Sequence, residues 1–291
     1  MGGVASVWRR GMAERQLDLF THGETRAGDR RSWGPSSCDI LSQPGPRATA
    51  LGDDALIEAI PDAGLTDASA LAAEAARRRL SAAVPALERL CRRFVGFGAD
   101  RAIPEQVAAV TALAGIGGPV ARHSLAGLIA TRVVQGPGLV PAMAAARQLG
   151  VDLPADLALI LLRHDDSRIR ADACGCVRAT PGILAALYEL MADTEAEVRC
   201  AAACALGRFG RPEARAPLAG LLRDRPTGVV IEAIVAVADE ACIILLGRIA
   251  RTVPELAEAA RDALEGIEHP RAAQILAASM RSDAIRSDAL R

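Results

Sequence analysis

AEVRCAAACALGRFGRPEA, residues Ala196–Ala214, begins with a run of small apolar residues that favours a helix. Gly207 and Gly210 follow the run, and glycine is favoured just past the end of a helix because it adopts left-handed backbone angles at little cost. Pro212 comes next, and proline is tolerated in the first turn of a helix, where the backbone N–H has no helical partner. The stretch therefore predicts a helix, a tight turn and a second helix.

The same pattern recurs along most of the chain at intervals of about 27–33 residues, which is typical of a repeat architecture. The best-matching copy is TALAGIGGPVA, residues 111–121, and other copies keep the helix and the glycine but not the proline. The predicted helix pairs are 68–80 with 82–94, 104–115 with 119–133, 139–150 with 155–163, 168–178 with 181–192, 196–208 with 212–223, 228–238 with 241–250, and 254–266 with 270–280.

The copy around residues 193–210 resembles HEAT repeats, especially the short kind seen in phycobilin lyase-related proteins. In that family an Asp in the turn precedes a Val-Arg-x-Ala-Ala helix that ends in Ala-Leu-Gly-x-x-Gly. The matching residues here are Asp193, Val198, Arg199, Ala201, Ala202, Leu206, Gly207 and Gly210. The resemblance covers about residues 68–280 and implies an all-α, right-handed α-solenoid of about seven HEAT-like helix pairs with one concave face. Such repeats bury their apolar faces only against their neighbours.

Composition agrees with a helical array. Half of the 291 residues are hydrophobic (51%), yet aromatic residues make up only 2%. Alanine, leucine and valine must therefore fill the core, and small side chains imply closely packed helices. The net charge of −1 provides no overall field to attract nucleic acid or a membrane surface.

The seven cysteines are an odd number, and no secretory signal or membrane-length apolar run is evident. These features predict free thiols in a reducing cytoplasm. Every basic side chain is arginine, which is typical of a GC-rich, bacterial genome. Met12 is an alternative start to Met1.

Residues 1–50 are rich in Gly, Ser, Arg and Pro, and we expect a flexible, largely disordered tail there. A lead-in segment over 51–67, the repeats over 68–280 and a C-terminal tail over 281–291 complete the predicted organisation.

The tail contains the peptide Gln16-Leu17-Asp18-Leu19-Phe20, in which all five positions resemble the motif by which bacterial replication and repair proteins bind the DNA polymerase sliding clamp. The resemblance implies that Leu19 and Phe20 fill an apolar pocket and that Leu17 packs on its rim. Gln16 would supply hydrogen bonds and Asp18 would face water. Alternatively, the peptide is a chance match within a short amphipathic helix that caps the first repeat.

Five arginines gather near the first predicted repeat, and such a cluster can contact phosphates. They are Arg77, Arg78, Arg79, Arg92 and Arg93. The favoured interpretation is a solvated outer face that Glu74, Glu88 and Glu105 help to neutralise, because the net charge does not favour nucleic acid. Direct contact with DNA is therefore not expected.

No catalytic, metal-binding or cofactor-binding pattern emerges. Cys174, Cys176, Cys200 and Cys204 lie on neighbouring equivalent helices, but Cys174 and Cys176 would point to opposite sides of a helix and could not join one tetrahedral site. Buried thiols at alanine-like positions are the favoured interpretation. His164-Asp165-Asp166 lies in a predicted turn, where capping or solvated roles are usual.

The sequence thus predicts a non-catalytic adaptor with no cofactor. It would bind a protein partner on its concave face and be tethered to the sliding clamp, in DNA replication or repair. One alternative is a HEAT-repeat scaffold without clamp contact. Another is a HEAT-like DNA glycosylase, disfavoured because the repeats contain no Trp and only Phe94, Phe97, Tyr188 and Phe209 as aromatics.

Overall fold

The computed structural model describes residues 46–278, and every regular element among them is helical. The predicted all-α class is therefore confirmed for this part of the chain. None of its helices has both the length and the apolar character needed to cross a membrane.

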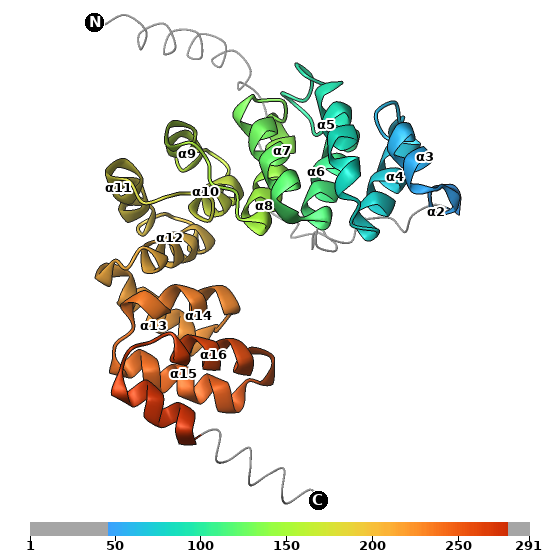
Figure 1. Cartoon of the computed structure of the whole chain (residues 1–291). Helices are drawn as coiled ribbons and strands as arrows, with labels where there is room; N and C mark the ends of the chain where they lie inside the picture. Colours follow the sequence, from blue (N-terminus) through green and yellow to red (C-terminus); the bar gives the residue numbers. More distant parts are fainter. Residues whose placement is uncertain (1–45, 279–291) are drawn as a thin grey trace, which may run out of the picture. The chain divides into compact units, whose positions relative to one another are not determined.

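The elements alternate between the first and second helices of successive pairs (Figure 1). First helices are α4 (Leu65–Arg77), α6 (Pro104–Ile116), α8 (Leu139–Leu149), α10 (Ser167–Cys174), α12 (Ala196–Arg208), α14 (Gly228–Ile234) and α16 (Ala257–Glu265). Second helices are α5 (Val84–Arg92), α7 (Gly118–Ala130), α9 (Ala155–Leu161), α11 (Pro181–Leu190), α13 (Arg215–Asp224) and α15 (Glu240–Thr252), and residues 270–278 are also helical. Short 3₁₀ turns, η2 (Ser81–Ala83), η3 (Gly136–Gly138), η4 (Pro212–Ala214), η5 (Val235–Val237) and η6 (Pro254–Leu256), extend several of them.

Packing runs between neighbours along the sequence. Each first helix from α6 to α14 packs on the first helix of the pair before it and of the pair after it. Among second helices, α5 packs on α7, α9 on α11, and α13 on α15, whereas α7 and α9, and likewise α11 and α13, barely meet. This is the predicted repeat packing; the count of seven repeats and the right-handed sense remain predictions.

The helical array begins earlier than the predicted repeat boundary at residue 68. Helices α2 (Pro46–Ala50) and α3 (Asp53–Ala59) precede the first pair, and both pack on α4. Leu56 of α3 is fully buried, so the predicted lead-in segment shares the hydrophobic core.

Several predicted helix ends are wrong, and two of them show how the chain leaves the helix. Helix α4 stops at Arg77 rather than at Leu80, because Arg79 adopts a left-handed conformation (φ 52°) that ends the helix. Helix α10 stops at Cys174 rather than at residue 178. The carbonyl of Cys176 instead accepts a 2.8 Å hydrogen bond from the backbone N–H of Leu153, which ties two interhelix segments together.

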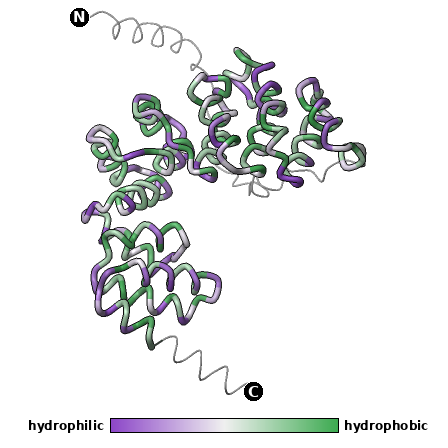
Figure 2. Tube along the Cα trace, viewed as in Figure 1, coloured by the Kyte–Doolittle hydropathy of each residue, from purple (hydrophilic) through white to green (hydrophobic). Residues whose placement is uncertain are grey.

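Small residues bring the first helices into close contact, as the composition predicted. Ala72, Ala109 and Ala202 are among the many alanines that are almost wholly buried. A Cβ atom added to Gly207 of α12 would lie 2.5 Å from the carbonyl oxygen of Ala233 in α14. Figure 2 shows hydrophilic and hydrophobic residues mixed along the helices, as expected where each helix buries one face.

Candidate interaction surface

The peptide Gln16–Phe20 lies outside the described residues. Its resemblance to the clamp-binding motif therefore remains a prediction from the sequence.

Four of the five arginines near the first pair form hydrogen bonds or ion pairs with other residues of the chain. Arg77 and Arg78 both donate to the carboxylate of Glu74, with Nη2–Oε1 and Nε–Oε1 distances of 2.7 and 2.6 Å. Glu74 is fully buried, not part of a solvated outer face as predicted. Hydrogen bonds from Arg77 and Arg78 outweigh this burial and lower the pKa of Glu74 from 4.5 to about 2.

The other two bound arginines belong to α5 and the residue that follows it. Arg92 pairs with Glu88 on the same helix at 2.8 Å, so the predicted neutralisation by Glu88 is confirmed. Arg93 donates to the carbonyl oxygens of Pro61 and Ala63 at 2.9 and 2.7 Å. Arg93 thus joins the end of α5 to the segment between α3 and α4, whereas Arg92 is paired within its own helix. Contact of these arginines with nucleic acid remains an untested prediction.

A partly buried ion pair connects α10 with the turn before α12. Arg170 donates through Nε and Nη2 to the two carboxylate oxygens of Asp193, both at 2.9 Å, in a two-pronged geometry. The side chains are only 14% and 9% exposed. Hydrogen bonds from Arg170 lower the pKa of Asp193 below its usual value. We call this contact the inter-repeat ladder.

Buried cysteines account for most of the thiols in the described part. Cys174 and Cys176 are fully buried, but Cys176 lies in the turn after α10, so the predicted opposition across one helix is wrong. Burial raises the pKa of both thiols to about 12, which keeps them protonated. Among residues 46–278 no group of three or more His, Cys, Asp or Glu side chains could hold a metal ion.

The turn at His164–Asp166 has a capping role, as predicted. The side chain of Asp166 accepts a 2.9 Å hydrogen bond from the backbone N–H of Arg168 at the start of α10. The backbone N–H of Asp166 in turn donates to Nδ1 of His164 at 3.0 Å.

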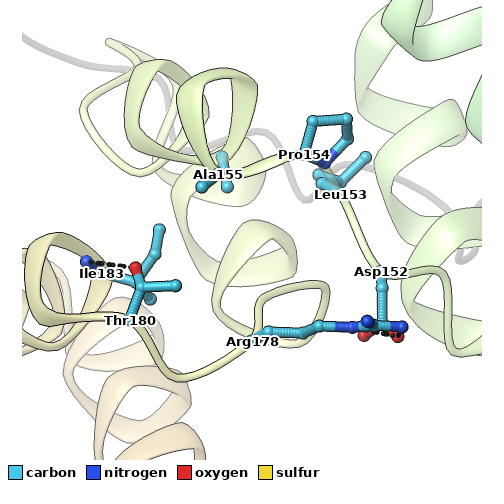
Figure 3. Close-up of a pocket in the computed structure, with 8 residues that line it drawn as sticks. Asp152, Leu153, Pro154, Ala155, Arg178, Thr180 and Ile183 are labelled. Atoms are coloured by element: carbon cyan, nitrogen blue, oxygen red, sulfur yellow. Dashed lines mark hydrogen bonds and ion pairs between the residues drawn. The ribbon is translucent and has the colours of Figure 1, made fainter.

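A groove of about 390 Å³ lies at the starts of α9 and α11, and we call it the α9–α11 groove. Figure 3 shows Asp152 and Arg178 joined on one side of it, and their ion pair measures 2.6 Å. Thr180 caps α11 by accepting a hydrogen bond from the backbone N–H of Ile183. The charges of this groove are therefore neutralised within it.

A second groove of about 370 Å³ lies where α11 and α13 separate over α12, and we call it the α11–α13 groove. Met191, at the end of α11, lines one side, and Pro217 and Leu221 of α13 line the other. Ala196, Arg199, Cys200 and Ala203 of α12 and Arg225 complete the lining. Cys200 is half-buried, unlike the buried thiols of Cys91, Cys174, Cys176, Cys204 and Cys242.

Both grooves lie within the segment that matches a known family, apart from the first two residues of the α9–α11 groove lining. Residues 154–238 match the family model of HEAT repeats. This segment runs from the start of α9 to the end of η5, and it includes the copy on which the predicted resemblance rests. The match covers less than a third of the chain and supports HEAT repeats there. The comparison with curated proteins found no match.

Sequence reasoning did not predict the two grooves. The α11–α13 groove lies where two neighbouring second helices separate, and no local residue pattern encodes that separation. The sequence does contain a partial signal for the α11–α13 groove. When the repeats are aligned on the first residues of α12 and α14, Arg225 takes the position that Asp193 has in the preceding repeat, so the charge there is reversed.

Proposed function

We propose that this chain is a non-catalytic protein-interaction scaffold. HEAT repeats are consistent with such a role, and the match over residues 154–238 is the observation that carries the proposal. The grooves over α9–α13 support it, because they provide recesses of side-chain size on the matched repeats.

The scaffold proposal is tested by cross-linking the full chain to its neighbours in its native cells and then purifying each captured protein. At least one of them should bind the purified chain directly, with a binding stoichiometry of 1:1 in isothermal titration calorimetry. If none of them binds directly, the scaffold proposal is refuted.

A finer proposal concerns the tail. We infer that Gln16–Phe20 binds the bacterial DNA polymerase sliding clamp and so places the scaffold in DNA replication or repair. Support comes from the five matching residues alone. Apolar anchor residues that fill pockets dominate such peptide contacts, so Leu19 and Phe20 should carry most of the affinity.

This proposal is tested by titrating the fluorescently labelled full chain with the purified clamp. The double variant Leu19→Ala, Phe20→Ala should bind at least tenfold more weakly than the wild type. Asp18→Ala is the matched control, because the resemblance places Asp18 toward water, and it should bind within about twofold of the wild type. Equal binding by the wild type and the double variant would refute the proposed clamp contact, and the proposal of a general HEAT-repeat scaffold would stand.

A further inference from the structure

The acceptor position of the inter-repeat ladder has the opposite charge in the next repeat. Asp193, the acceptor of the ladder, stands two residues before Glu195, the N-cap residue of α12. In the following repeat the N-cap residue of α14 is Thr227, so the equivalent position is Arg225. A cation thus occupies the position at which the preceding repeat has a carboxylate.

The donor of the ladder is retained. Arg199 is the fourth residue of α12, as Arg170 is the fourth residue of α10. Its Nη1 donates to the carbonyl oxygens of Asp193 and Thr194 at 2.7 and 2.8 Å, which holds the guanidinium in place. Within residues 46–278, however, neither Arg199 nor Arg225 forms an ion pair.

Arg199 and Arg225 both line the α11–α13 groove, and most of its other lining residues are apolar. The α9–α11 groove has nearly the same volume, but its arginine, Arg178, is neutralised by Asp152. The α11–α13 groove therefore combines an apolar recess with two arginines for which the described part of the chain supplies no ion-pair partner.

We propose that the α11–α13 groove binds a peptide segment of a partner protein in which a carboxylate side chain lies beside an aliphatic one. Arg199 and Arg225 would take the carboxylate, because guanidinium groups bind carboxylates through paired hydrogen bonds. Met191, Pro217 and Leu221 would cover the aliphatic side chain. The inference rests on the proposed scaffold function and specifies the chemistry of its partner.

A peptide fits this groove better than a nucleic acid does. Single-stranded nucleic acids are held by aromatic side chains on which bases stack, and no aromatic residue lines this groove. The net charge of −1 also provides no field to attract a polyanion.

The experiment uses the full chain and a fluorescein-labelled probe peptide, Leu-Glu-Leu-Asp-Leu, measured by fluorescence anisotropy. The amide peptide Leu-Gln-Leu-Asn-Leu is the comparison, and we expect it to bind at least tenfold more weakly. Arg225→Asp should also weaken binding of the acidic peptide at least tenfold. The melting temperature of this variant should not fall, because the new carboxylate takes the ladder position opposite Arg199.

Arg223→Asp is the matched control, because it makes the same charge change at an exposed residue that does not line the groove. It should bind within about twofold of the wild type. Binding should also slow the alkylation of Cys200, measured by mass spectrometry, because this thiol lies within the groove. Equal binding of the two peptides, unchanged binding by Arg225→Asp, or tighter binding of a single-stranded oligonucleotide would each overturn the proposal.

Failure of this proposal is distinguishable from failure of the scaffold proposal. If a captured native partner binds the wild type and Arg225→Asp equally well, the groove proposal is overturned and the scaffold proposal stands. If no captured protein binds the chain directly, the scaffold proposal fails, whatever the probe peptide does.

Discussion

Replacement of Gly207 by alanine tests the close packing of first helices. In an open helical position, Gly→Ala stabilises a helix by about 1 kcal/mol. At Gly207 the new Cβ would lie 2.5 Å from the carbonyl oxygen of Ala233 and 2.5 Å from Cδ1 of Leu218. These distances are about 1 Å shorter than the separation at which non-bonded atoms attract, so α14 would have to move.

The magnitude follows from two opposing contributions. Overpacking a core costs about 1–3 kcal/mol, which offsets or exceeds the gain in helix propensity. Gly220 in α13 is the matched control, because it also lies inside a helix and an added Cβ would meet no atom within 4 Å. Gly220→Ala should therefore stabilise the protein. The difference in unfolding free energy between the two variants isolates the contact, at about 1–3 kcal/mol.

Urea unfolding followed by far-ultraviolet circular dichroism measures this difference. Hydrogen exchange locates it, and the amides of α14 should exchange faster in Gly207→Ala than in Gly220→Ala. If Gly207→Ala were as stable as Gly220→Ala, with equal exchange in α14, the close approach of α12 and α14 would be refuted.

Three further outcomes follow from the contacts described above. Asp193→Ala should lower the unfolding free energy by about 1.5–3 kcal/mol, because Arg170 loses its charged acceptor; a double-mutant cycle with Arg170→Ala measures the coupling, and additive effects would contradict it. Glu74→Gln should destabilise the protein at neutral pH, and its deficit in urea unfolding should shrink as pH falls from about 4.5 to about 2, because the lowered pKa of Glu74 contributes stability only while its carboxylate stays ionised; a deficit constant with pH would contradict this. Cys200 should react with iodoacetamide at least tenfold faster than Cys174 in the folded chain, and equal rates by mass spectrometry would contradict the burial of Cys174.

Helix starts marked by proline were predictable from the sequence, whereas some other starts and several helix ends were not. Pro104 and Pro181 mark the first residues of α6 and α11 because proline acts locally, through its fixed φ angle and its missing N–H. After α10 ends, the carbonyl of Cys176 accepts a hydrogen bond from Leu153, which lies in another part of the chain. A pattern that considers one segment at a time cannot include that contact.

The candidate site shows the same division. The half-buried Cys200 and the lining residue Arg199 belong to the stretch that predicted the fold, so their place on α12 was predictable. The groove beside them was not predictable, because it lies where α11 and α13 separate. Glu74 was misplaced for a related reason: its burial depends on the packing of two arginines around it, and charge alone indicates a surface position.

Neighbour-only packing has a mechanical consequence. Among residues 46–278 the helices pack mainly on neighbouring pairs, so pulling the two ends of the helical array apart in an optical trap should not force the whole array to yield at once. The chain should lengthen in a series of steps, each releasing one helix pair of about thirty residues, or roughly 100 Å of extended backbone. The weakest junction would yield first, and the remaining pairs would still bear load.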